Sequence, residues 1–280
     1  MRLSMAILAA SAAAWAGGAQ AASVEVRDAV ARITVVPQDR ADVKVEVVKS
    51  HPELPLAIRT EAGRTVIDGD LHRKIRDCNG MSERPSISVR GVGKVAYDEM
   101  PQVVIYTPKA VDVTAGGAVQ GAIGRSASLR LKNSGCASWT IADVAGAASI
   151  HQSGAGDVRM GAADRLDVRL SGAANIRATK VREGGLDAHL SGAGGVQIAD
   201  VRGPVEARVS GVGQIEVDGG RASKLRASVS GIGQVEFEGS ADDLDATISG
   251  LGSIRVKEVT GQVTKSVSGG GSVRVGNRPS

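Results

Sequence analysis

Apolar and polar residues alternate along most of this chain, most clearly in residues 225–237, LRASVSGIGQVEF. Leu225, Ala227 and Val229 alternate with polar residues before the glycine-rich centre, and Val235 and Phe237 do so after it. A period of two predicts β-strands with one buried face, and no part of this segment has helical spacing. We therefore expect two strands joined by a Ser-Gly-x-Gly turn, followed by a second turn rich in Gly, Asp and Lys.

The same phrase recurs at even intervals, as VSGVGQIEV at 209–217 and ISGLGSIRV at 248–256. The sequence numbers of its serines increase in steps of 18, 20, 19, 20, 19 and 19. The predicted corner residues are Ser153, Gly154, Ser171, Gly172, Ser191, Gly192, Ser210, Gly211, Ser230, Gly231, Ser249, Gly250, Ser268 and Gly269. A degenerate copy has Ser134 one period earlier (153 − 134 = 19), and Ala115 lies one period before that (134 − 115 = 19). So steady a period predicts a repeat architecture.

Residues of one kind recur at fixed offsets from the serine. The position three before it is small in four copies, Ala188, Ala207, Ala227 and Ala246. Such columns are expected of stacked rungs about 4.8 Å apart. The predicted fold class is all-β, a two-sheeted parallel β-helix or solenoid of ~19-residue rungs with an irregular β-rich N-terminal cap. Lys265 replaces the alanine in the last copy, so we expect that rung to be terminal and open to water.

Each Ser-Gly pair is predicted to form the corner of a rung. We expect the glycine to supply a positive φ and the serine hydroxyl to bond nearby backbone amides. A phosphate-binding glycine loop would have to lead into a helix, which the pattern does not predict. The calcium-binding nonapeptide and the acyltransferase hexapeptide repeats have other periods.

The start of the chain predicts a secretory signal peptide over residues 1–21. Arg2 precedes an apolar, alanine-rich stretch that ends in an Ala19-Gln20-Ala21 cleavage pattern. A buried N-terminal helix is the alternative. The predicted organisation is then a signal peptide at 1–21, an irregular β-rich region or cap at 22–112, solenoid repeats at 113–276 and a tail at 277–280.

The cap region keeps the alternation but loses the period. Residues 43–48, 87–97 and 102–108 are predicted strands, residues 61–64 a hairpin turn, and residues 73–85 a polar loop. That loop contains Cys78, and Cys136 lies at the first degenerate corner. In an oxidising compartment an even pair predicts a disulfide, with two buried free thiols as the alternative.

Composition limits the class of partner. The net charge of +4 is too small to predict binding to nucleic acid or to an anionic membrane. Aromatic residues make up only 2% of the chain, so the core must be aliphatic, with Trp139 and Phe237 in inward columns. No segment after the signal peptide is apolar enough to span a bilayer as a helix.

The SGxGxI/V units that follow an exported, β-rich start resemble the DUF2807 family, the autotransporter-adhesin "head GIN" proteins. The resemblance covers roughly residues 100–275, and the start VEVRDAVARITVVPQDRADVKVEVV is similar to the related DUF4097 proteins. The resemblance implies a right-handed two-sheeted β-superhelix, a place in the envelope or at the cell surface, and a role in adhesion. It carries no catalytic residues.

Two outward columns of charge are the candidate binding surface. Four positions before the serine lie Asp167, Asp187 and Glu206, and two positions before it lie Arg169, His189 and Arg208. The first interpretation is lateral ion pairing on a solvated face. The alternative is a carboxylate cluster that binds Ca²⁺ or acts as an acid/base pair on a polysaccharide.

We therefore predict a non-enzymatic exported protein, adhesin-like or ligand-binding, that is periplasmic, secreted or on the cell surface. Its partner is expected to be a surface glycan or an envelope component. The alternatives are a polysaccharide lyase or glycosidase and a structural protein that assembles end to end. No cofactor and no metal site are predicted, since the four histidines lack metal-ligand spacing.

Overall fold

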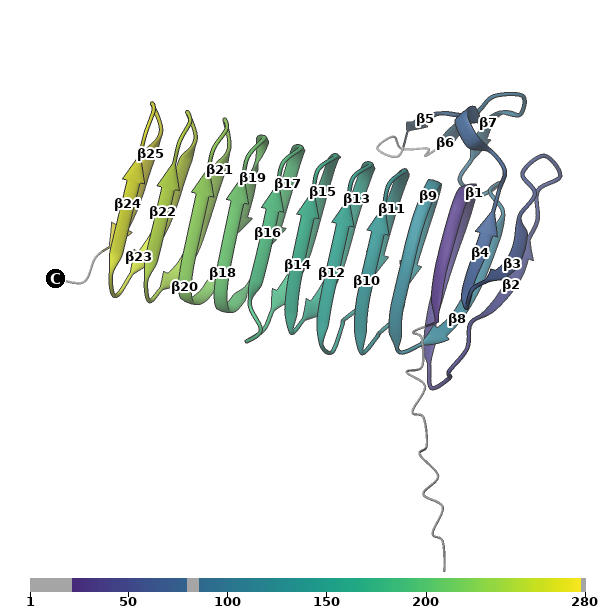
Figure 1. Cartoon of the computed structure of the whole chain (residues 1–280), viewed down its shortest axis with the longest axis horizontal. Helices are drawn as coiled ribbons and strands as arrows, with labels where there is room; N and C mark the ends of the chain where they lie inside the picture. The colour runs from purple at the N-terminus through teal and green to yellow at the C-terminus, as the bar shows by residue number, and fades with distance from the viewer. Residues whose placement is uncertain (1–21, 80–85, 278–280) are drawn as a thin grey trace, which may run out of the picture.

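The computed structural model describes residues 22–79 and 86–277 and shows a long stack of strands with a smaller sheet beside one end (Figure 1). The N-terminal part comprises β1 (Ser23–Gln38), β2 (Lys44–Lys49), β3 (Ala57–Glu61), β4 (Arg64–Asp68), the 3₁₀ turn η1 (His72–Lys74), β5 (Ile75–Asn79), β6 (Ser86–Val89), β7 (Gly93–Ala96) and β8 (Gln102–Pro108). The predicted signal peptide and part of the tail, residues 278–280, lie outside the described residues.

The stack is a parallel β-solenoid of two sheets, as the sequence pattern predicts. Its first sheet contains β10 (Ser128–Asn133), β12 (Ala147–Gln152), β14 (Arg165–Leu170), β16 (Leu186–Leu190), β18 (Val201–Val209), β20 (Gly220–Val229), β22 (Leu244–Ile248) and β24 (Val263–Val267). Its second sheet contains β11 (Cys136–Ile141), β13 (Ala155–Ala163), β15 (Ala173–Val181), β17 (Ala193–Ile198), β19 (Val212–Val217), β21 (Gln234–Ala241), β23 (Ser253–Val259) and β25 (Ser272–Asn277). The long β9 (Ala110–Ile123) pairs with β10 in the first sheet and β11 in the second, and β1 stacks on it.

The core lies between the two sheets and is built from the inward columns. Leu170, Leu190, Val209 and Val229, each one position before a corner serine, are all buried. Trp139 and Phe237 are buried in the same core, which confirms the prediction that these aromatics face inward. A continuous aliphatic interior of this kind needs few aromatic residues because every rung adds the same small layer.

The corner glycines are required for a different reason from the predicted one. Of the seven Ser-Gly glycines, all within the described residues, only Gly269 has a positive φ. In the other six, an added Cβ would lie 1.9–2.4 Å from a carbonyl oxygen of the corner one rung earlier. The stacked corners are therefore too close for any side chain. In two copies positive φ falls instead on the second glycine of the motif, at Gly156 and Gly194.

The corner serines also bond differently from the expectation. The hydroxyl groups of Ser134 and Ser153 donate to backbone carbonyls of the preceding rung, at 3.4 Å to Ala115 O and 3.2 Å to Asn133 O. The predicted bonds were to backbone amides. The serine N–H groups bond to carbonyls of the rung below, so each corner is tied to the previous one along the solenoid.

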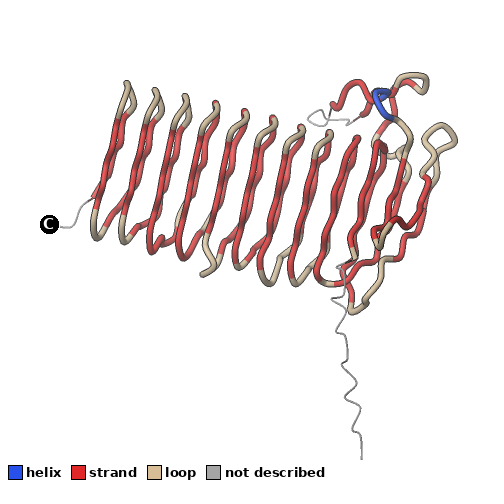
Figure 2. The backbone as a smooth tube through the Cα atoms, viewed as in Figure 1, coloured by secondary structure: helices blue, strands red, loops and turns tan. Residues whose placement is uncertain are grey.

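The rungs differ slightly in length, and the difference lies in the turns at the second edge of the solenoid, opposite the Ser-Gly corners (Figure 2). Ala163 pairs with Val181, a separation of 181 − 163 = 18, but Leu166 pairs with Leu186, a separation of 186 − 166 = 20. The additional length lies in the turn at 182–185. At the N-terminal end the predicted alignment is wrong by one position, because Ala115 pairs with Asn133 and not with Ser134.

The N-terminal region contains two kinds of structure. Strands β1, β4 and β8 pair in parallel and continue the solenoid, whereas β2 and β3 add antiparallel edges. Strands β5, β6 and β7 form a separate antiparallel sheet. The predicted strand at 87–97 is a hairpin, because the chain turns at Gly91 and Gly93, both with positive φ. Part of the predicted loop at 73–85 is strand β5, which pairs with β6.

The last rung is open to water, as the lysine at position 265 predicts. Lys265 occupies the inward column opposite Ala246, and it is exposed. Its ammonium group lies 3.5 Å from the carbonyl oxygen of Val273, across the end of the stack. Among the described residues, β24 has a strand partner on one side only, β22.

Candidate functional site

The six charged residues predicted as a binding surface lie together on the outer face of the first sheet. Asp167 pairs with Asp187 and Asp187 with Glu206 on successive strands β14, β16 and β18. In the same way Arg169 pairs with His189 and His189 with Arg208. We call this set of six residues the charged ladder.

Each acid of the charged ladder meets a basic residue two positions further along its own strand. The distances are 3.4 Å from Arg169 Nε to Asp167 Oδ1 and 2.9 Å from His189 Nε2 to Asp187 Oδ1. Arg208 bonds to Glu206 and lies 2.7 Å from His189 Nε2. The Oδ1 atoms of Asp167 and Asp187 are shielded from solvent, and neither accepts a well-aligned hydrogen bond from the described residues.

The basic column extends further towards the N-terminus than the sequence analysis proposed. Lys132 and His151 pair in register below Arg169, and these three residues line a hollow of about 470 Å³ along the corner edge. Burial lowers the pKa of His151, and the charges of Arg169 and Lys132 act in the same direction while Asp167 opposes them. The offset of two before Ser134 and Ser153 would have identified both residues.

Beside this hollow lie two buried amide side chains that the pattern did not reveal. Asn133 and Gln152 are 2% and 1% exposed and occupy inward positions where later rungs have Leu, Val or Ile. Asn133 Nδ2 donates to Gln152 Oε1 at 2.8 Å. Asn133 Oδ1 and Gln152 Nε2 are buried and have no hydrogen-bond partner among the described residues. The pair therefore specifies how these two rungs are aligned, but it adds little to the stability of the fold.

On the second sheet, acidic side chains gather on two neighbouring strands. Glu216 on β19 pairs in register with Glu236 on β21. Burial raises the pKa of Glu216, and the neighbouring Asp218, Glu236 and Glu238 raise it further. Arg255 neutralises Glu236 at 2.9 Å. Within residues 22–79 and 86–277, no three His, Cys, Asp or Glu side chains are arranged to hold a metal ion.

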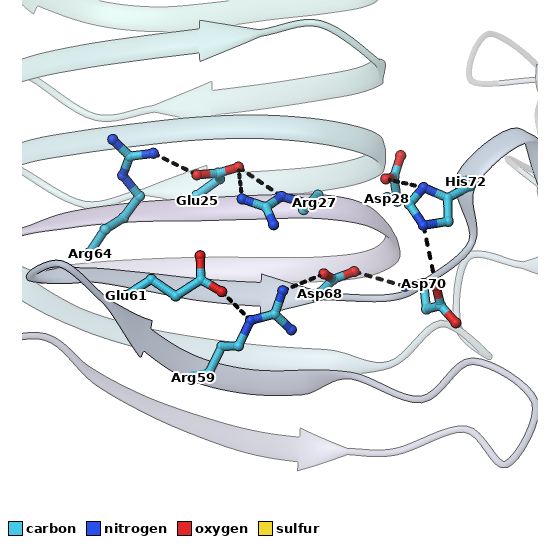
Figure 3. Close-up of polar contacts among 9 residues, drawn as sticks. All are labelled: Glu25, Arg27, Asp28, Arg59, Glu61, Arg64, Asp68, Asp70 and His72. Carbon is cyan, nitrogen blue, oxygen red and sulfur yellow. Dashed lines mark hydrogen bonds and ion pairs between the residues drawn. The ribbon is translucent and has the colours of Figure 1, made fainter.

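A network of ion pairs fastens the hairpin β3–β4 to the first rung (Figure 3). Glu25 accepts from Arg64 at 2.7 Å and from Arg27 at 2.8 Å, and these two bonds lower its pKa. Arg59 donates to Asp68 at 2.9 Å. The backbone N–H of Asp70 is the first cause of the lowered pKa of Asp68. This network ties β4 to β1 and β3 to β4, and the side chains of Arg59, Glu61 and Arg64 are about half exposed.

A further open hollow lies near the N-terminal end of the second sheet, where Tyr97 faces strand β1. Arg32 Cζ lies 4.2 Å from the centre of the Tyr97 ring, and Arg159 borders the same hollow from β13. Sequence reasoning did not bring these residues together because Arg32, Tyr97 and Arg159 are far apart in the chain.

Comparison with known proteins agrees with the repeat pattern. The family model described as "Putative auto-transporter adhesin, head GIN domain" (DUF2807) matches residues 74–220 and 205–279. The chain belongs to the DUF2807 family. The family resemblance read from the SGxGxI/V units is thereby confirmed, and the model also covers strands β5 to β8 of the N-terminal region.

Two solved structures resemble this DUF2807 protein in fold. One is described as a putative adhesin from Bacteroides fragilis, with 15% identity, coverage of 91% of this chain and 93% of that chain, and a TM-score of 0.41. The other is described as a putative lipid binding protein from Parabacteroides distasonis, with 16% identity, 92% and 93% coverage, and a TM-score of 0.47. No curated protein matches. The part of the chain that the structure describes contains no helix long and apolar enough to span a membrane.

Proposed function

We propose that this DUF2807 protein is a non-enzymatic, adhesin-like envelope protein that binds an extended ligand, such as a surface glycan, along the charged ladder. The observation that carries the proposal is the in-register series of paired charges on β14, β16 and β18. A linear polymer lying along the solenoid would meet equivalent groups on these three successive rungs, about 4.8 Å apart.

The ion pairs of the charged ladder are weak enough for a ligand to replace them. Arg169 and Arg208 have half-exposed side chains, and exposed ion pairs contribute only about 0–1 kcal/mol each. The Oδ1 atoms of Asp167 and Asp187 lack aligned donors, and a rotation of each carboxylate would present them to ligand hydroxyl groups. Many weak contacts of this kind add up when they are made by one chain of sugars.

The arrangement does not favour the polysaccharide-active enzyme. In a glycosidase both carboxyl groups must face the bond that is cleaved rather than a neighbouring basic side chain. Asp187 has His189 at 2.9 Å and Glu206 has Arg208, so both carboxylates of the candidate pair have a basic partner. The same contacts suit a binding surface.

The experiment is a glycan-array screen of the purified full-length chain, followed by binding assays on the ligands found. A triple variant, Arg169→Gln with His189→Gln and Arg208→Gln, is expected to lose most of the binding. Arg177→Gln is the matched control, because Arg177 is an exposed arginine on the second sheet. The proposal is contradicted if the triple variant keeps its binding to every ligand found, or if the purified chain turns over any polysaccharide.

We also propose that the chain is exported and that Cys78 and Cys136 form a disulfide. Among the described residues no cysteine is free, and Cys136 packs against a cluster of buried apolar residues that includes Val30, Ile87 and Ala118. Cys78 pairs along the backbone with Ile87, a member of that cluster. The closed loop spans 136 − 78 = 58 residues, for which the chain-entropy model gives about 4 kcal/mol. Thiol titration of denatured, non-reduced protein from the envelope fraction should find no reactive thiol, and two reactive thiols would refute the bridge.

A further inference from the structure

The hollow beside Tyr97 has the composition of a ligand site, and neither the family description nor the charged ladder accounts for it. Its volume of about 350 Å³ falls within the usual range for small-molecule sites, roughly 300–1,000 Å³. Its floor is the outer face of β1, β9 and β11, with the small Ala122 near its centre. One side is formed by the cap through Tyr97, and the opposite side by Arg159 on β13.

The charged residues that line this hollow have one sign. Arg32 and Arg159 line it, and none of its lining residues is a carboxylate. Arg32 is stacked on Tyr97 and forms no ion pair within the described residues, so its guanidinium remains available to an anion. Arg159 lies 3.5 Å from Asp157, and because its own side chain is largely exposed, a ligand carboxylate can replace this contact at little cost.

The uncharged groups of the hollow suit a polyhydroxylated ligand. Gln102 and Gln120 face each other across Arg32 in the strand register, and each amide can both donate and accept. Thr34 and Thr140 add hydroxyl groups on either side of Ala122. Tyr97 is 37% exposed, and its ring offers an apolar surface with a polar tip.

We propose that this hollow binds an acidic oligosaccharide through a carboxylate-bearing sugar, with Arg32 and Arg159 as the anion-binding residues. A guanidinium can bond both oxygens of a carboxylate, which gives direction as well as attraction. Tyr97 would pack against the sugar ring, and Gln102 and Gln120 would bond its hydroxyl groups. The inference goes beyond the proposed function, since this site lies on the second sheet and does not depend on the charged ladder.

The test is isothermal titration calorimetry of the full-length chain with trigalacturonic acid, and with the neutral trisaccharide maltotriose as the comparison. Trigalacturonic acid is expected to bind at least about tenfold more tightly than maltotriose. Arg159→Gln and Tyr97→Ala should each weaken binding on the order of tenfold, the usual effect of losing one charge-assisted bond or one aromatic contact. Arg32→Lys keeps the charge but loses the two-pronged geometry, and it should weaken binding as well.

The controls separate this site from the charged ladder. Arg177 pairs in register with Arg159 one rung further along but does not line the hollow, so Arg177→Gln should change affinity less than about twofold. The triple variant of the ladder should bind trigalacturonic acid normally. Thermal denaturation verifies that each variant is folded, and the exposed Arg159 is the safest position in that respect. The proposal is overturned if trigalacturonic acid does not bind, or if it binds equally well to Arg159→Gln.

Discussion

Replacement of Gly231 by alanine isolates the steric demand of a Ser-Gly corner. The φ of Gly231 is not positive, so an L-residue can adopt its backbone conformation. The new Cβ would lie 2.4 Å from Gly211 O and 3.0 Å from Ser210 O, both backbone atoms. An ordinary contact needs about 3.5 Å or more, so the two corners must separate by about 1 Å.

The cost is that of overpacking, about 1–3 kcal/mol, and valine should cost more because it adds two methyl groups. In a chain of this size, 2 kcal/mol corresponds to roughly 4–8 °C in Tm. The matched control is Gly195→Ala, where the nearest atom would be Asn175 Oδ1 at 3.4 Å and φ is again not positive. That variant should be unchanged or more stable by about 0.4–1 kcal/mol, since it restricts the unfolded chain.

The assay is thermal denaturation followed by far-ultraviolet circular dichroism, with Ser228→Val as a second control at a half-buried strand position. Ser228→Val should stay within about 0.5 kcal/mol of the parent. Gly231→Asn distinguishes the two explanations of the corner, because asparagine tolerates positive φ better than alanine but occupies more space. If Gly231→Ala melts together with Gly195→Ala, or if Gly231→Asn is the more stable of the two corner variants, the steric reasoning is wrong.

Three further predictions concern the rest of the chain. Lys265→Val should produce concentration-dependent oligomers in light scattering, because it removes the charge at the end of the stack; a parent that already assembles through this end would contradict this. Glu216→Gln should raise Tm at neutral pH, because the raised pKa of Glu216 means that folding disfavours its ionised form. The gain in Tm should disappear as the pH falls to about 4.5, the pKa of the unfolded chain, because the carboxyl group is then protonated in both states. Mass spectrometry of protein from the cell envelope should show a chain without residues 1–21, and a mature chain that retains Met1 would refute the signal peptide.

The fold could be predicted from the sequence because each rung repeats the same local information. The alternation places Leu225, Ala227 and Val229 in the core, and the constant offset from the serine sets which rung stacks on which. The mechanism of the corner could not be predicted, since a glycine required by a close neighbour and a glycine required by positive φ look alike in sequence. Only the stacked carbonyl of Gly211 distinguishes them.

The two candidate sites also differ in whether they follow the repeat. The charged ladder follows the repeat, so Arg169, His189 and Arg208 could be grouped from their offsets alone. The hollow beside Tyr97 joins residues from outside the period, and no spacing rule relates Tyr97 to Arg159. Sequence reasoning was weakest where β1 and the cap lose the repeat, and the missed site lies there.

The two edges of the solenoid differ in how much change they can accept. At the Ser-Gly edge, six glycines lie against the carbonyls of the previous corner, so a residue added at one corner would disturb its neighbours on both sides. At the opposite edge, the turn at 182–185 is already longer than its predecessor, and the strands on either side remain in register. Insertions are therefore expected to be tolerated only at the edge that contains the turn at 182–185. Loops could be lengthened or grafted at that edge while the stacked strands stay unchanged.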